Sequence, residues 1–189
     1  MKSALLLIDI QNDYFPGGKN ELFQPEQAAA KAQLLLEYFR KRGLPVFHVQ
    51  HISVKSDSSF FLPETEGVKI NSLVSPKSEE MVLVKHAPNA FLNTGLEQLL
   101  HAQNIERLVI CGMMSHMCVD STVRAAKDAG FSVLLPEDAC TTKDLNWGGN
   151  PIPAPTVHQA FMAALSGSFA QIIETKDLLD KGFHCYKAK

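Results

Sequence analysis

Short apolar runs alternate along the chain with segments in which apolar residues recur every three or four positions. The apolar runs predict strands near residues 4–8, 45–50, 81–84, 107–111, 131–135 and 169–173. The runs at 4–8 and 107–111 are expected to be buried, and the last is expected to be an edge or final strand. Strands that alternate with helices are typical of a parallel sheet covered by helices on both faces. We therefore expect an α/β fold with three layers, α-β-α, around a mostly parallel sheet of about six strands.

Four segments carry the apolar spacing of amphipathic helices. The first begins at Pro25, a favourable first helical residue, and ends at Gly43. Thr94 is placed to cap the second helix, and the third ends at Gly130. The last helix begins near Pro155. These helices are expected to cover the two faces of the sheet.

Two stretches, residues 52–78 and 141–154, do not fit the alternation of strands and helices. Connections of this length in a compact domain are usually functional or disordered. The second stretch contains the only tryptophan, Trp147, beside residues that permit sharp turns. We expect both stretches to be binding loops. The second is a candidate lid or subunit contact, with a plain surface loop as the alternative.

Composition narrows the class of protein. With 189 residues and 46% hydrophobic content, the chain is expected to form one domain over residues 1–189. A net charge of −2 gives no basic surface for nucleic acid, and no apolar stretch approaches the ~20 residues of a membrane span. We expect a cytoplasmic protein. Its cysteines form no CxxC pair, so reduced thiols are expected in place of disulfides or structural zinc at Cys111, Cys118, Cys140 and Cys185.

Cys118 stands at the start of the helix that follows the strand at 107–111. Unpaired amide N–H groups and the positive end of the helix dipole favour a thiolate there, and the same groups can hold an oxyanion. The position therefore predicts a nucleophile. The alternative is an inert small residue that fills the strand–helix junction.

Two ionisable residues end other predicted strands. Asp9 follows the run at 4–8, and Lys85 follows the run at 81–84. Because ligands bind outside the carboxyl ends of parallel strands, these side chains can converge with Cys118. A carboxylate, an ammonium and a thiol supply the base, cation and nucleophile of covalent acyl transfer. The alternatives are a turn carboxylate at Asp9 and a solvated Lys85.

Four motifs occur together in this order: 7-LIDIQNDYF-15, Val84-Lys85 followed by Ala90-Phe91, 112-GMMSHMCV-119 and 136-PEDAC-140. In these residues the chain resembles, nearly end to end, the isochorismatase-like cysteine hydrolase family, which includes nicotinamidases and related amidases. The resemblance implies the isochorismatase-like (Rossmann-like) fold. It also implies assembly as a homodimer or homotetramer.

The resemblance implies a mechanism as well. Asp9 would accept and return the proton, Lys85 would act electrostatically, and Cys118 would attack and carry a thioester. A cis peptide between Met113 and Met114 would aim the Met114 N–H, beside that of Cys118, at the oxyanion. Enzymes that cleave isochorismate lack the cysteine. A C–N bond in a small amide, lactam, ureido or carbamoyl compound is therefore the expected target.

Three residues are expected to bind substrate: Tyr14, His116 and Trp147. Tyr14 falls where related amidases place an aromatic residue that packs on the substrate, although core packing is the alternative. His116 lies two residues before Cys118 and suggests a competing Cys–His dyad. This spacing leaves the imidazole little freedom to approach the sulfur, so we expect His116 to face the pocket or the surface.

Nicotinamidases of this family bind a metal through an Asp-x-His pattern after the second strand. Here the region reads His48-Val49-Gln50-His51-Ile52, with Gln50 near the place of the aspartate. A divalent site without its carboxylate loses charge and a ligand. We therefore expect no metal and no other cofactor, and we expect structural or pocket roles for His48 and His51.

Two other function classes stay open. One is a flavodoxin-like module that binds a small molecule, although no glycine-rich phosphate loop follows Ile8. The other is a thiol redox protein that uses Cys118 with Cys111 or Cys140, which the missing CxxC weakens.

Overall fold

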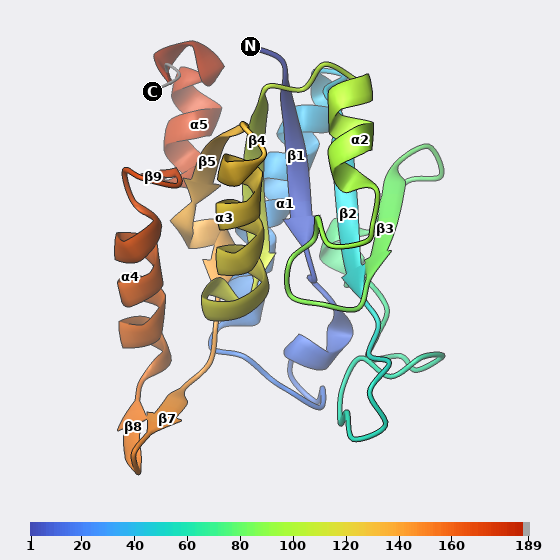
Figure 1. Ribbon diagram of the computed structural model, residues 1–189, viewed down its shortest axis with the longest axis vertical. Helices are drawn as coiled ribbons and strands as arrows, with labels where there is room; N and C mark the ends of the chain where they lie inside the picture. The colour runs from blue at the N-terminus through green and yellow to red at the C-terminus, as the bar shows by residue number, and fades with distance from the viewer. Residues whose placement is uncertain (187–189) are drawn as a thin grey trace.

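The central sheet contains six parallel strands in the order β3-β2-β1-β4-β5-β9 (Figure 1). This computed structural model describes residues 1–186. The expected α/β class is confirmed. The strands are β1 (Ser3–Ile8), β2 (Val46–His51), β3 (Met81–Lys85), β4 (Arg107–Met113), β5 (Ser132–Pro136) and β9 (Gln171–Ile173), and a short β6 (Cys140–Thr141) also pairs with β4.

Helices cover both faces of the sheet. Helix α1 lies behind it in Figure 1 with α5 packed against α1, whereas α2 and α3 lie in front and α4 packs against α3. The helices are α1 (Pro25–Lys41), α2 (Leu96–Ala102), α3 (Asp120–Asp128), α4 (Ala154–Leu165) and α5 (Thr175–Lys181). Single turns of 3-10 helix occur at Asn12–Tyr14, Ser72–Val74, Glu137–Ala139 and Phe183–Cys185, and a π-helical turn spans Ser115–Val119.

The two central strands form the core because every residue of β1 and β4 is buried. Their apolar runs therefore lie between helix layers on both faces. The backbones approach closely at the carboxyl end, where Ile8 pairs with Gly112. A Cβ at Gly112 would lie 2.0 Å from the carbonyl oxygen of Ile8, and the φ of Gly112 is +132°. Only glycine fits at this position.

Two elements near the C-terminus differ from the sequence prediction. Residues 141–154 are not irregular throughout, because β7 (Leu145–Trp147) and β8 (Asn150–Ile152) form an antiparallel hairpin. Gly148 and Gly149 form its turn, both with positive φ, a Gly-Gly hairpin signal. The helix near Pro155 is also not the last, since α5 follows it. The only apolar residues of α5 are the adjacent Leu178 and Leu179, so it shows no helical period.

Residues 52–78 are fixed to the carboxyl edge of the sheet by buried polar side chains. Asp13 accepts hydrogen bonds from the N–H of Phe61 at 2.6 Å and of Lys19 at 3.1 Å. Gln11 donates to the carbonyl oxygen of Val68 at 2.7 Å. The connection therefore has a defined path beside the strand ends.

Within residues 1–186, every helix is too short or too polar to traverse a lipid bilayer.

Candidate active site

Four side chains meet at the carboxyl edge of the sheet, each from the end of a different strand. Asp9 follows β1, His51 ends β2, Lys85 ends β3, and Cys118 lies in the π-helical turn after β4. The side chains of Asp9 and Lys85 are 0% exposed, and Cys118 is 4% exposed. We call Asp9, His51, Lys85 and Cys118 the strand-end cluster. The structure thus brings the three predicted catalytic residues together.

Lys85 lies at the centre of the strand-end cluster. Its Nζ atom is 2.7 Å from Asp9 Oδ2, 2.9 Å from His51 Nδ1 and 3.3 Å from Cys118 Sγ. It also donates to the carbonyl oxygen of Ala87 at 2.9 Å. An ammonium has three protons, so these four acceptors use its full donor capacity. The alternative of a solvated Lys85 is wrong, because the neighbouring groups replace water around the ammonium.

The charges of Asp9 and Lys85 depend on each other. Burial raises the pKa of Asp9, although the Lys85 ammonium opposes this. Burial alone would lower the pKa of Lys85, but the charge of Asp9, together with that of Cys118 when its thiol is ionised, outweighs burial, and the pKa is raised. Apart from the ion pair, neither oxygen of Asp9 receives a well-directed hydrogen bond within residues 1–186. The carboxylate therefore keeps capacity to accept a proton.

The backbone of Asp9 has a φ of +50°. Aspartate is one of the few residue types that enter this left-handed region with some frequency. The Asp9 N–H donates to the carbonyl oxygen of Val49 at 3.1 Å, and the Asp9 carbonyl oxygen accepts from Gln11 at 2.9 Å. The chain thus turns tightly just after β1 while it stays bonded to β2.

The surroundings of Cys118 favour its thiol over its thiolate. Burial raises its pKa, the charge of Asp9 raises it further, and Lys85 only partly offsets both. These shifts oppose the thiolate that the sequence predicts at a helix N-terminus. The turn that holds Cys118 also precedes α3, so Cys118 does not lie in the first turn of that helix. The peptide bond between Met113 and Met114, just before this turn, is cis.

The donor atoms of Asp9, His51 and Cys118 lie within 4.8 Å of one another, which is a spacing that could hold a metal ion. However, Lys85 Nζ contacts all three of these residues. A divalent ion would have to displace or repel this ammonium. The residues therefore fit an internal cation at this position better than a bound metal.

His51 is the member of the strand-end cluster whose role sequence reasoning did not resolve. Burial first, and then the charge of Lys85, lowers the pKa of His51 to about 4, so its ring is neutral near pH 7. The sequence put His51 beside the end of its predicted strand, but its contact with Lys85 depends on the register of β2 and β3. His48, by contrast, is buried with Nε2 3.0 Å from Glu80, and Gln50 donates to Val68 at 2.9 Å. Both hold the fold together.

The three expected substrate-binding residues occupy different environments. Tyr14 is buried with its ring 4.6 Å from that of Phe61. Burial raises its pKa, and the charges of Cys118, when ionised, and Asp9 raise it further. Trp147 is 81% exposed on the β7–β8 hairpin, which projects from the body of the protein (Figure 1). It does not line the cluster within the described chain.

His116 is directed to other partners than Cys118. Its Nδ1 atom contacts the hydroxyl of Thr142, and its ring packs edge-on against Phe161 at 6.0 Å. Burial lowers its pKa, and the charge of Lys143 lowers it further. The structure therefore gives no support to a dyad of Cys118 and His116.

Comparisons with known proteins agree with this architecture. The chain matches the isochorismatase domain family over residues 3–177. It is 51% identical over 179 residues to the uncharacterized isochorismatase family protein YddQ of Bacillus subtilis, covering 95% of this chain and 99% of the relative. It is 32% identical over 170 residues to a streptothricin hydrolase of Streptomyces noursei, covering 89% of this chain and 58% of that relative.

A solved structure gives the same result. The crystal structure of an isochorismatase hydrolase from Oleispira antarctica matches with a TM-score of 0.91 and 44% identity, covering 95% of this chain and 96% of the other. The family match over residues 3–177 includes the strands that supply the strand-end cluster. The chain therefore belongs to the isochorismatase family of hydrolases.

Proposed function

We propose that this hydrolase uses Cys118 to cleave a C–N bond in a small amide, lactam, ureido or carbamoyl compound. One observation carries the proposal: a thiol, a carboxylate and an ammonium lie in contact in a buried cluster. A thiol that attacks covalently suits an acyl carbon. The relative named streptothricin hydrolase supports hydrolysis of a small molecule.

The first step is addition of sulfur to the carbonyl carbon of the substrate. Asp9 accepts the proton of Cys118 as the S–C bond forms, so a free thiolate never has to exist in the buried site. The raised pKa of Asp9 favours this transfer. The backbone N–H groups of Met114 and Cys118 are the proposed donors to the oxyanion, and a single donor of this kind contributes about 3 kcal/mol in other enzymes.

The second half of the reaction reverses the proton transfer. Asp9 protonates the departing amine as the C–N bond breaks, and a thioester remains on Cys118. Asp9 then removes a proton from water, which attacks the thioester and releases the acid. Lys85 stays protonated throughout because its pKa is raised by Asp9 and Cys118. Its part is to hold the other groups in place electrostatically.

The pocket around this chemistry is proposed to include Tyr14, which lies near Asp9 and Cys118. Trp147 could take part only from another subunit or after movement of its hairpin, since it is exposed in the described chain. Assembly as a homodimer or homotetramer, and a cytoplasmic location, stay predictions.

The two other function classes receive little support. A module that binds phosphate would need donors after β1, whereas the buried carboxylate of Asp9 follows it. A redox pair would need a second reactive thiol. All four cysteines are free, and burial raises the pKa of Cys111 and raises that of Cys140 to about 12. Unlike Cys118, neither of these two thiols has an ammonium within hydrogen-bond distance in the described part of the chain.

A compound screen tests the proposal. Wild-type protein is incubated with amides, lactams, ureido compounds, carbamates and esters, and the release of ammonia or amine is measured with and without a chelator. We expect a C–N compound to be turned over in both conditions, with a thioester on Cys118 detected by mass spectrometry. Cys118→Ala should reduce turnover by a factor of about 10³ or more. Cys185→Ala is the matched control, because its thiol is exposed.

Two results would contradict the proposal. One is turnover that persists in Cys118→Ala at the wild-type rate. The other is a preference for esters with no cleavage of any C–N compound, which would keep the nucleophile but reject the bond assigned to it.

A further inference from the structure

His51 belongs to the strand-end cluster, but the reaction proposed above gives it no part. We propose that His51 is a specificity-determining residue: its Nε2–H donates to an acceptor group on the acyl part of the substrate, while its Nδ1 holds Lys85. This inference rests on the proposed function, because it assigns a second contact to the molecule that Cys118 attacks.

The tautomer of His51 follows from its contact with Lys85. An ammonium can only donate, so Nδ1 must accept the hydrogen bond at 2.9 Å. A neutral imidazole carries one proton, which must then be on Nε2. The lowered pKa of His51 agrees with a neutral ring. The cluster therefore contains an N–H donor whose position is set by Lys85.

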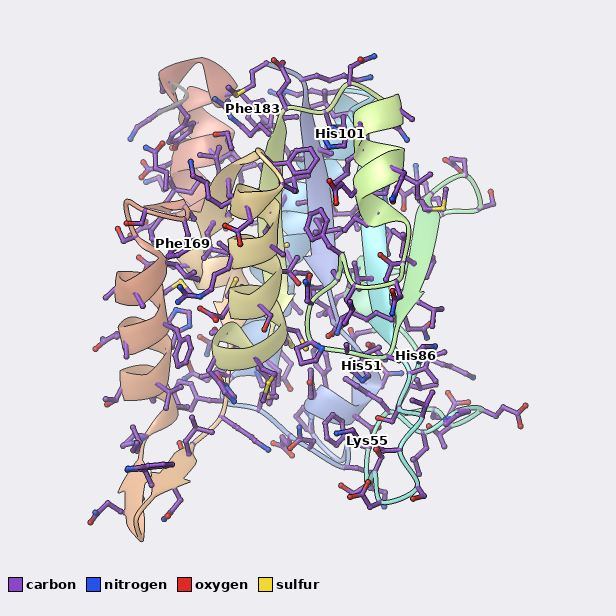
Figure 2. The ribbon with its side chains drawn as sticks, viewed as in Figure 1. His51, Lys55, His86, His101, Phe169 and Phe183 are labelled. Carbon is purple, nitrogen blue, oxygen red and sulfur yellow. The ribbon has the colours of Figure 1, made fainter. Side chains whose placement is uncertain are left out.

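The backbone and ring of His51 are held in place. Its N–H donates to Gln11 Oε1 at 2.7 Å, and its carbonyl oxygen accepts from Gln11 Nε2 at 2.9 Å. The ring lies against Phe61, with centroids 5.9 Å apart. Figure 2 shows His51 at the end of the sheet near His86, above the loop that carries Lys55. A fixed donor of this kind can select a substrate at little entropic cost.

The Nε2 atom is open to a ligand. It has no acceptor within residues 1–186, and it is not one of the buried unpartnered atoms of the described chain. The side chain is half-buried, and one of its ring nitrogens lies within 4.8 Å of Asp9 and Cys118. The donor is therefore at the same edge as the attacking sulfur.

The other members of the cluster cannot take this role. Asp9 accepts and does not donate in its ionised form, and Cys118 gives its proton to Asp9 during attack. Lys85 already has four acceptors. His51 is thus the remaining side-chain donor of the strand-end cluster. The substrate class that fits is an acyl compound with a hydrogen-bond acceptor close to the scissile carbonyl, and a carboxylate is the strongest such acceptor.

Aldehydes probe this contact without knowledge of the natural substrate. The thiol of Cys118 adds to an aldehyde carbon, its proton passes to the carbonyl oxygen, and the C=O double bond becomes a single bond, so no oxidant is needed. Glyoxylate and succinic semialdehyde carry a carboxylate, and acetaldehyde and butanal are their counterparts of equal carbon number. Protection of Cys118 from alkylation by iodoacetamide, followed by peptide mass spectrometry, gives the apparent Kd of each aldehyde.

The variants separate the two nitrogen atoms of His51. Glutamine can put an amide N–H near the Nε2 position, whereas asparagine reaches only the Nδ1 position. We expect at least one aldehyde acid to bind more tightly than its counterpart in wild type. His51→Asn should reduce this preference about tenfold, and His51→Gln should keep most of it. His86→Asn is the matched control for a nearby histidine and should leave the preference unchanged.

The outcomes distinguish the two proposals. If no aldehyde protects Cys118 in wild type, the proposed nucleophile is wrong. Two other results would contradict only the role of His51 and leave the proposed function unaffected. One is that the aldehyde acids bind no more tightly than their uncharged counterparts, and the other is that His51→Asn binds the acids with the wild-type preference. Melting curves of each variant establish that the compared proteins are folded.

Discussion

Two carboxylates that pair with cations lie at opposite edges of the sheet, Asp9 buried and Glu80 partly buried, and they differ in how completely they are bonded. Glu80, just before β3, accepts hydrogen bonds from Arg40 Nε and Nη2, each at 2.7 Å, from the Lys77 N–H at 2.9 Å, and contacts His48 at 3.0 Å. Burial raises its pKa, but these partners outweigh burial, Arg40 first, and lower the pKa to about 2. Glu80 is thus held as a carboxylate.

Asp9 has one close cation and no other directed hydrogen bond within the described chain. For this residue burial outweighs the cation, and the pKa is raised. The difference shows how one type of ion pair serves two purposes. A carboxylate with all its acceptor capacity in use stabilises the fold, whereas one with unused capacity can exchange a proton.

The largest expected effect is a difference in activity between variants of Asp9 and of Glu80. Asp9→Asn removes the proton acceptor, so kcat/KM for the compound found by screening should fall about 10²–10⁴-fold. Glu80→Gln should leave kcat/KM of the folded protein within a few-fold of wild type, because Glu80 lies outside the strand-end cluster. Steady-state kinetics of both variants at equal folded concentration checks this. Equal losses of kcat/KM in the two variants would contradict a special role of Asp9 as proton acceptor.

The next effect concerns stability. Lys85→Met leaves Asp9 buried without its cation, and breaking a buried pair from one side costs about 3–5 kcal/mol. We expect this loss in the free energy of unfolding at pH 7, measured with denaturant, and a smaller loss at acid pH, where Asp9 is protonated. The control is Lys69→Met in the exposed pair of Lys69 and Glu66, which should change stability by less than about 1 kcal/mol. Similar values for both variants would contradict a buried ion pair.

A smaller effect, on the pH dependence of stability, tests the opposite pKa shifts of Glu80 and Asp9. Because the folded-state pKa of Glu80 is lowered, its stabilisation is present above the unfolded value of 4.5 and is lost as pH falls toward about 2. Glu80→Gln should therefore lower the free energy of unfolding by about 2 kcal/mol at pH 7, a figure already reduced for partial solvent screening. The difference should shrink between pH 4.5 and 2. A difference independent of pH would show that Glu80 acts by packing alone.

The raised pKa of Asp9 has the reverse sign. Burial disfavours its ionised form in the folded state. Above the folded-state pKa, Asp9 is ionised and destabilises the fold most, and this destabilisation decreases as pH falls through that pKa and Asp9 takes up a proton. Activity should move the other way, since Asp9 must be ionised to accept the thiol proton. The pH profile of kcat/KM should therefore lose its acid limb in Asp9→Asn.

The positions of the reactive groups could be predicted from the sequence, because the end of each apolar run indicates the end of a strand. Asp9, Lys85 and Cys118 each follow a continuous apolar run, and in a parallel sheet those ends share one edge. The state of the groups could not be predicted this way. The pKa of Cys118 depends on burial and on the distance to Asp9, which only the folded chain sets.

His51 illustrates a different limit. The pattern from His48 to His51 does not reveal which histidine faces the cluster, because both lie in one strand that also carries Gln50. The pairing of His51 with Lys85 in the β2–β3 register decides it. For Trp147, the local signal predicted a turn, but nothing local could place the hairpin relative to the sheet.

The most direct measurement is the single-turnover rate at which Cys118 is acylated, obtained by rapid quench and intact-protein mass spectrometry. The proposed proton transfer from Cys118 to Asp9 predicts fast formation of the adduct in wild type and formation slower by about 10² or more in Asp9→Asn. Acylation of Asp9→Asn at the wild-type rate would contradict it, because the thiol would then lose its proton without the carboxylate beside it.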